Sequence, residues 1–220
     1  KKEINYVNQL KNKITKSKNV SELEIAILGC YIPLNVSEKI TKKFGDFYAN
    51  DQISFEVKKS EVLAILGENG AGKTTLMNIL FGHYTPDAGS VNFEGNAIEF
   101  GNTNNAIKLG IGMVHQHFTL AENLTVLENI IIGRQSIFSL SLPKRQARVK
   151  ILELSKKFGL PIDPDELVAN LSVSEKQRIE ILKTLFLDCK LLILDEPTAA
   201  LTPQETDALF STIRNMIETG

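Results

Sequence analysis

This 220-residue sequence has few cysteines, only short apolar runs and almost no excess of charge of either sign. Its two cysteines, Cys30 and Cys189, argue against a disulfide framework and favour a reducing compartment. The longest apolar runs, such as Leu191–Leu194, are too short to span a bilayer. Lysine and arginine number 25 against 26 aspartates and glutamates, so no global basic field indicates DNA or RNA as a partner. The first thirty residues lack the bounded apolar block and cleavage site of a secretory signal.

The overall composition is that of a soluble globular protein, with lysines concentrated at the amino-terminal end. Hydrophobic residues make up 43% of the chain and charged residues 23%, a balance that supports a packed core. Residues 1–20 hold six lysines and one acid, Glu3. Apolar residues recur there at helical spacing, at Ile4, Val7, Leu10 and Ile14. We interpret this stretch as a solvated helix or a frayed extension, and the alternative is a helix on a membrane surface.

Strand and helix patterns alternate along the rest of the chain. Strands are predicted at 32–36, 53–57, 61–66, 91–93, 98–100, 111–114 and 191–194. Helices are predicted at 74–81, 127–132, 144–158, 173–189 and 204–217. The last of these helices opens on a capping box, Thr202 to Glu205. Because no strand pattern occurs between Phe118 and Ala169, the sequence predicts a strand-rich core interrupted by a helical insert.

A glycine-rich segment, Gly67-Glu-Asn-Gly-Ala-Gly-Lys-Thr74, matches the phosphate-binding pattern G-x-x-x-x-G-K-[ST]. A predicted strand precedes it and a predicted helix follows, which is the context that the pattern requires. Glycines let successive backbone N–H groups turn towards phosphate, and the helix N-terminus adds a favourable dipole. We expect Lys73 to reach the β- and γ-phosphates and Thr74 to bind Mg²⁺.

Two acids, Asp195 and Glu196, follow the buried strand Leu191–Leu194. Ligands of open α/β sheets bind at the carboxyl ends of the strands. An aspartate there can hold Mg²⁺, usually through water, and the adjacent Glu196 can orient or deprotonate the attacking water. Together with Lys73 and Thr74, these acids predict a site that hydrolyses a nucleoside triphosphate.

Further segments resemble the motifs of ABC ATPases, in the order that this family has them. Leu171-Ser-Val-Ser-Glu175 resembles the LSGGQ signature, and Gln116 stands where the family has its Q-loop glutamine. Phe44 resembles the A-loop aromatic that stacks on adenine, and Ala199-Ala-Leu-Thr202 resembles the D-loop. The resemblance covers residues 32–220. It implies an α/β P-loop NTPase fold with a mixed central sheet, an antiparallel β subdomain and a helical signature subdomain.

The finer resemblance is to importer ATPases for simple sugars and nucleosides, which usually carry two ATPase halves in one chain. The segments that resemble this branch are 110–118, 124–129, 178–183 and 196–205. We expect residues 1–30 to be a basic leader and 31–220 the amino-terminal ATPase half, with core segments 31–116 and 190–220 and a helical subdomain at 117–189. The family's switch histidine follows a further strand, and His83 cannot fill its position, so we expect a truncated half that hydrolyses ATP poorly alone.

The resemblance implies a role for each motif residue. Catalysis would rest on Glu196, Lys73 and Gln116, and Mg²⁺ would be bound by Thr74, Gln116 and Asp195. ATP would be bound by Phe44, Gly67, Glu68, Asn69, Gly70, Ala71, Gly72, Lys73, Thr74 and Thr75. Ser172 and Ser174 would contact ATP held by a second ATPase half. The other implied partners are membrane permease subunits and a periplasmic or surface substrate-binding protein, with no nucleic acid, at the cytoplasmic face of the membrane.

Some residues depart from the pattern or invite another interpretation. Ser174 stands where this branch commonly has glycine; its N–H remains, and the affected site is the partner's. His115 and His117 flank Gln116, but no third metal ligand is near in sequence, so we favour ordinary loop histidines. We interpret Cys189 as a core residue on the apolar face of its helix.

Two other functions remain open at this point. A soluble ABC ATPase could act on ribosomes or DNA, although the span between Lys73 and Leu171 leaves no room for the long coiled coil of DNA-repair relatives. A regulatory ATP-binding half without turnover is the other alternative, and Glu196 argues against it. The sequence does not indicate the transported solute.

Overall fold

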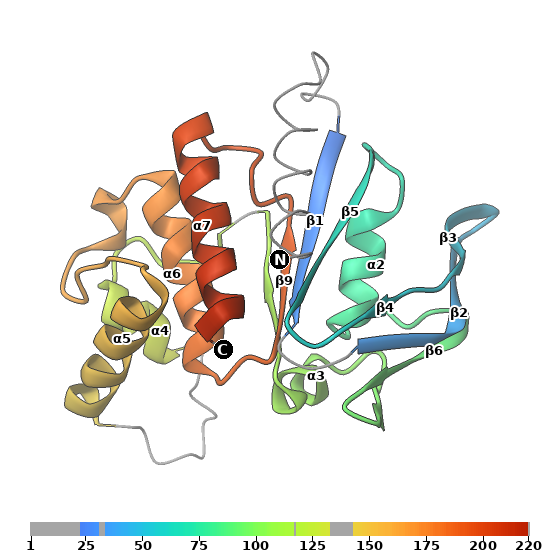
Figure 1. Ribbon diagram of the computed structural model, residues 1–220, viewed down its shortest axis with the longest axis horizontal. Coiled ribbons are helices and arrows are strands. Elements are labelled where there is room, and N and C mark those ends of the chain that lie inside the picture. The colour runs from blue at the N-terminus through green and yellow to red at the C-terminus, as the bar shows by residue number, and fades with distance from the viewer. Residues whose placement is uncertain (1–22, 31–33, 117, 133–142, 220) are drawn as a thin grey trace.

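The computed structural model describes residues 23–30, 34–116, 118–132 and 143–219 (Figure 1). The strands are β1 Leu23–Cys30, β2 Leu34–Phe44, β3 Phe47–Ile53, β4 Glu56–Val57, β5 Glu61–Glu68, β6 Ala88–Phe93, β7 Asn96–Ala97, β8 Ile111–Val114 and β9 Leu191–Asp195. The helices are α2 Lys73–Leu80, α3 Thr103–Leu109, α4 Val126–Ile132, α5 Lys144–Phe158, α6 Val173–Phe186 and α7 Pro203–Thr219, with a short 3₁₀ turn at Val168–Asn170. No helix within these described ranges is both long and apolar enough to cross a membrane.

The central sheet has the strand order β5-β1-β9-β8. β8 is parallel to β9, whereas β1 is antiparallel to both of its neighbours, β5 and β9. β5, β9 and β8 therefore run in the same direction, and their carboxyl ends lie at one edge of the sheet. Those ends are Glu68, Asp195 and Val114. The topology thus brings the phosphate loop, the acidic pair and the Gln116 segment to the edge where α/β proteins bind ligands.

The strand β1 lies inside the region that we expected to be a basic leader. Its sequence, Leu-Glu-Ile-Ala-Ile-Leu-Gly-Cys, is apolar at almost every position, which suits a strand between two others in a covered sheet. The lysine-rich pattern before it favours a leader over residues 1–30. Residues 1–22 lie outside the described residues, so the helical leader stays a prediction.

A second, antiparallel sheet has the order β3-β2-β6-β7, with β4 also paired to β2. The predicted strand at 53–57 is divided here, because β3 ends at Ile53 and β4 begins at Glu56. The β2–β3 hairpin closes on the pair Phe44 and Phe47, with Gly45 at φ +60° in the turn. This sheet is the expected antiparallel β subdomain, and the hairpin projects from the right of the molecule (Figure 1).

Two hydrophobic cores meet at β9. Leu192 and Leu194 belong to the core of the helical side, whereas Leu191 and Ile193 belong to the core shared with α2 and the antiparallel sheet. This division follows from the alternation of side chains along a strand. Figure 1 shows α4, α5, α6 and α7 on one side of β9, and α2 and the antiparallel sheet on the other. The buried strand predicted from the run 191–194 is confirmed.

The helical insert follows its prediction closely, with one correction. The structure places α5 at Lys144–Phe158, the predicted bounds, but α6 ends at Phe186. Cys189 therefore lies beyond the helix, where its thiol donates to the carbonyl of Leu191 at 3.1 Å and packs against the helical core.

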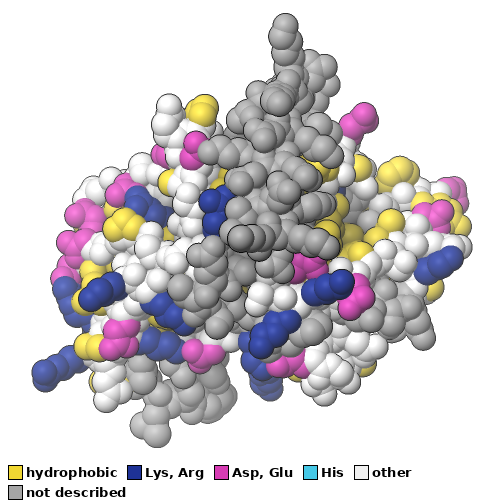
Figure 2. All heavy atoms as spheres, viewed as in Figure 1, with side chains coloured by type: hydrophobic (Ala, Val, Ile, Leu, Met, Phe, Trp, Pro, Cys, Tyr) yellow, Lys and Arg dark blue, Asp and Glu magenta, His cyan; other side chains and the backbone are white. Residues whose placement is uncertain are grey.

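Lysines, arginines and acids are interspersed over the visible face of the molecule rather than separated by sign (Figure 2).

Truncation of a β9 leucine tests the burial of this strand. We expect Leu192→Ala to lower the free energy of unfolding by about 2–5 kcal/mol, because the side chain is only 2% exposed and leaves a cavity between packed layers. Leu152→Ala in α5 is the control; its side chain is 42% exposed, and the change should stay below about 1 kcal/mol. Chemical denaturation measures both, and equal losses would contradict the place of β9 between two cores.

Candidate nucleotide site

The phosphate loop joins β5 to α2, and at one position its backbone accommodates only glycine. Gly72 precedes the first turn of α2 with φ +85°. A Cβ on Gly72 would lie 1.9 Å from the carbonyl oxygen of Ala49. The β3 strand thus packs directly against the turn, and the loop has no room for a side chain there.

Lys73 crosses the loop from the first position of α2. Its side chain is buried, and its Nζ donates to the carbonyl oxygens of Gly67 at 3.0 Å and Glu68 at 2.7 Å. These bonds hold the ammonium group over the mouth of the loop. The positive charge therefore lies where the loop N–H groups and the start of α2 already favour an anion.

Thr74 and Asp195 meet although 121 residues separate them in the chain. The Thr74 hydroxyl donates to Oδ1 of Asp195 at 3.2 Å. Asp195 is only 5% exposed at the end of β9. A hydroxyl and a carboxylate beside a phosphate loop are oxygen ligands of the kind that Mg²⁺ prefers, so these two residues fit the predicted metal.

Gln116 and Glu196 form a second pair at the same edge. Val114 of β8 pairs with Leu194 of β9, and continuing this register places Gln116 opposite Glu196. Nε2 of Gln116 donates to Oε2 of Glu196 at 2.6 Å. Glu196 has φ +50°, which costs a non-glycine residue about 1 kcal/mol or more. Such strain is typical of functional positions, and here it turns the chain sharply after Asp195.

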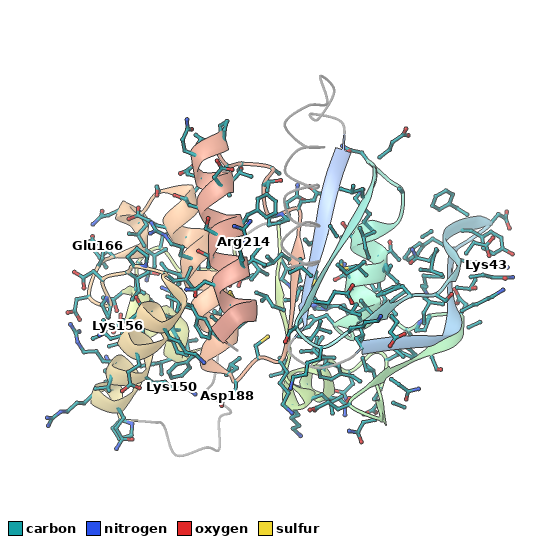
Figure 3. The ribbon with its side chains drawn as sticks, in the orientation of Figure 1. Lys43, Lys150, Lys156, Glu166, Asp188 and Arg214 are labelled. Atoms are coloured by element: carbon teal, nitrogen blue, oxygen red, sulfur yellow. The ribbon has the colours of Figure 1, made fainter. Side chains whose placement is uncertain are left out.

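Exposed aromatic rings surround the hairpin that carries Phe44. Phe44 is 49% exposed and makes an edge-to-face contact with Tyr84, with ring centroids 5.9 Å apart. The ammonium of Lys42 lies 5.5 Å from the Phe44 ring, and that of Lys43 lies 4.2 Å from the Tyr48 ring. Lys43 marks this outer end of the molecule in Figure 3. A half-exposed aromatic ring is suited to stacking on a base.

Asn50 supports the phosphate loop, and sequence reasoning missed it. Its side chain is 5% exposed, and Nδ2 donates to the carbonyl oxygen of Gly72 at 3.0 Å. Its Oδ1 is buried without a hydrogen-bond partner among the described residues. No motif includes this position, and it lies between the predicted strands 32–36 and 53–57.

The signature segment lies apart from the phosphate loop. Ser172 caps α6 and forms a complete capping box with Glu175, whose pKa is lowered chiefly by the hydroxyl of Ser172 and also by its backbone N–H. The hydroxyls of Ser172 and Ser174 are 3.2 Å apart. Figure 1 shows α6 and α2 on opposite sides of the central sheet. The structure thus does not bring the two serines to the phosphate loop of the same chain.

The histidine next to Gln116 packs against rings. His115 lies 5.6 Å from His83 and 6.1 Å from Phe81, measured between ring centroids. Burial lowers the pKa of His115, and the nearby His83 lowers it further. His117 lies outside the described residues. Among those that are described, no three His, Cys, Asp or Glu side chains gather as a metal site.

Motif order, sheet edge and paired side chains together point to one family. The family model described as ABC transporter matches residues 50–199. This chain belongs to the ABC transporter family. The match includes the phosphate loop, the Gln116 segment, the signature and the acidic pair.

Relatives of this ABC domain are importer proteins. The nucleoside import ATP-binding protein NupA of Lactococcus lactis subsp. cremoris is 50% identical over 181 residues. The guanosine import ATP-binding protein NupO of Bacillus subtilis is 45% identical over 181 residues. Each alignment covers 82% of this chain but 36% of the relative. The chain therefore spans only about a third of the length of these relatives.

Solved structures confirm the ABC fold. The ADP conformation of MJ1267, an ATP-binding cassette of an ABC transporter, superposes with a TM-score of 0.74 at 27% identity, covering 86% of this chain and 78% of that one. CbiO1 of Clostridium perfringens, part of the cbiONQ ABC transporter complex, gives a TM-score of 0.69 at 29% identity, covering 86% and 74%. The predicted α/β P-loop architecture is thus correct.

A methyl group at Gly72 tests the tight packing of the phosphate loop. We expect Gly72→Ala to destabilise the fold by more than about 2 kcal/mol, because the new Cβ combines a positive φ with the clash against Ala49. Gly45→Ala is the matched control: its φ is +60° but nothing lies within 4 Å, so about 1–2 kcal/mol of strain is expected. Unfolding of the nucleotide-free protein measures both, and equal losses would argue against the clash.

Proposed function

We propose that this ABC domain binds and hydrolyses ATP to power the import of a sugar or nucleoside through a membrane transporter. The observation that carries the proposal is the pairing of Thr74 with Asp195 and of Gln116 with Glu196 at one sheet edge, beside the phosphate loop. A loop that only bound an anion would need neither pair. The names of the relatives, which import nucleosides and guanosine, supply the class of solute.

The phosphate loop would hold the triphosphate by its backbone. The N–H groups of residues 67–75 would contact the β- and γ-phosphates, and Lys73 would leave the carbonyls of Gly67 and Glu68 to reach the same oxygens. Phe44 would stack on the adenine from the hairpin. The loop N–H groups and Lys73 would stabilise the negative charge on the terminal phosphate during transfer, whereas the Phe44 ring would hold only the base.

Thr74, Gln116 and Asp195 would hold Mg²⁺, which would neutralise part of the negative charge of the phosphates. Glu196 would orient the attacking water and accept its proton, with Gln116 fixing the carboxylate through the bond at 2.6 Å. These residues position and polarise, which is most of what phosphoryl transfer requires of a protein.

A second ATPase half is the first of the proposed partners, and the position of Ser172 and Ser174 supports it. Since α6 is separated from α2 by the sheet, these serines would serve a nucleotide on a second ATPase half. Permease subunits and a substrate-binding protein would complete an importer, with this domain peripheral on the cytoplasmic face. The pairing of Gln116 with Glu196 also disfavours a regulatory half without turnover, and the import names of the relatives disfavour action on the ribosome.

Loss of the carboxylate at Glu196 tests the proposed chemistry. In the full-length chain assembled with its permease, we expect Glu196→Gln to lower kcat for ATP by at least about 100-fold while the ATP KM stays within a few-fold, because a base is removed and binding is kept. Glu94→Gln is the matched control, since Glu94 also has positive φ (+53°, against +50° for Glu196) but pairs with Lys190. Unchanged turnover in Glu196→Gln would remove this residue from catalysis.

The serine in the signature gives a second test. Ser174→Gly should raise ATP turnover of the assembled transporter several-fold, because a glycine lets the start of α6 approach the partner's phosphate without a Cβ. The gain should appear in kcat at saturating ATP. No gain would contradict the idea that Ser174 weakens the opposite site.

A further inference from the structure

One face of α6 carries polar side chains that reach towards the nucleotide site. Gln177, Glu180 and Lys183 recur every three residues and therefore share a face of the helix. Gln177 and Glu180 are each 6% exposed, although both are polar. Buried polar groups cost free energy unless they are hydrogen-bonded, so their partners indicate what this face holds.

Glu180 holds the loop that follows Gln116. Its Oε1 accepts from the backbone N–H of Thr119 at 2.7 Å and from the Thr119 hydroxyl at 3.0 Å. Lys183 donates to the same hydroxyl at 3.1 Å and lies 3.6 Å from Oε2 of Glu180. Thr119 is thus fixed by two side chains of one helix, three residues after Gln116.

The second half of the catalytic pair is held by the same helix. Nε2 of Gln177 donates at 2.7 Å to the carbonyl oxygen of Pro197, the residue after Glu196. The hydrogen bond between Gln116 and Glu196 therefore has both of its ends attached to α6, through Thr119 on one side and Pro197 on the other. The helix can fix the relative position of the two loops only while its bonds to both Thr119 and Pro197 are present.

We propose that Glu180 is a positioning residue, which sets the place of Gln116 relative to Glu196 by holding Thr119. This inference rests on the proposed ATPase function. Glu180 touches no reacting group itself and acts through the loop. Because Ser172 caps α6 and Glu180 lies within it, one helix connects the signature segment to the Gln116 loop.

Removal of the carboxylate tests this role in the full-length transporter. We expect Glu180→Ala to lower kcat for ATP by about 10- to 100-fold with the ATP KM within about twofold, as for a misplaced catalytic group. Glu180→Gln keeps an acceptor for Thr119 and should recover most of the rate. Glu153→Ala, an exposed glutamate of α5, is the control and should leave the rate unchanged.

A double variant separates positioning from general weakening of the fold. If Glu180 acts through Gln116, Glu180→Ala should cost little further rate in a Gln116→Ala background. The same fold-loss in both backgrounds would overturn the proposal. If Glu180→Ala does not fold, Glu180→Met, which fills a similar volume without an acceptor for Thr119, takes its place, and full activity of that variant would overturn the proposal equally.

Hydrogen exchange tests the attachment of Thr119 to Glu180 and does not depend on ATP turnover. Peptides covering residues 116–121 should exchange faster in Glu180→Ala or Glu180→Met than in wild type, because the Thr119 N–H loses its acceptor. Unchanged exchange would overturn the role of Glu180. Absence of ATP turnover in wild type, together with faster exchange in the variants, would instead reject the proposed ATPase function and leave the attachment supported.

Discussion

The burial of β9 on both faces fixes the geometry of the whole site. Leu191 and Ile193 pack into one core while Leu192 and Leu194 pack into the other, so a slip by one residue would move the charged Lys190 or Asp195 into a core position. Asp195 and Glu196 follow directly, so the register of β9 also sets their positions. The parallel pairing with β8 then places Gln116 beside Glu196. Hydrophobic burial of β9 thus sets the positions of the polar side chains Asp195, Glu196 and Gln116.

The strain at Glu196 is held in place by this arrangement. A positive φ at a glutamate would relax in an isolated peptide, since the left-handed region is unfavourable for a residue with a Cβ. Here β9 anchors the preceding backbone and Gln177 binds the carbonyl of Pro197 on the following side. The bend separates the side chain of Glu196 from that of Asp195. As a result, one carboxylate meets Thr74 and the other meets Gln116.

The parts of the fold that were predicted from sequence are those with a local signal. The run 191–194, the glycine-rich loop and the periodic helix 144–158 each carry their pattern within a few residues, and the structure agrees with all three. β1 was missed although it is apolar, because the lysine-rich stretch before it favours a leader and because its neighbours, β5 and β9, come much later in the chain. Asn50 was missed for the same reason, since its partner Gly72 is 22 residues away.

The polar face of α6 shows why such residues resist sequence reasoning and why they matter. Buried polar positions at Gln177, Glu180 and Thr184 interrupt the apolar pattern, so periodicity alone makes this helix look poorly amphipathic. Each buried group is nonetheless satisfied, and two of the three bind loops rather than the helix itself. Because breaking either bond would leave a polar group unpaired in the interior, helix and loops are stable only in a matched arrangement. The same free-energy penalty that makes these residues unfavourable in a core therefore couples the signature helix to the two loops of the nucleotide site.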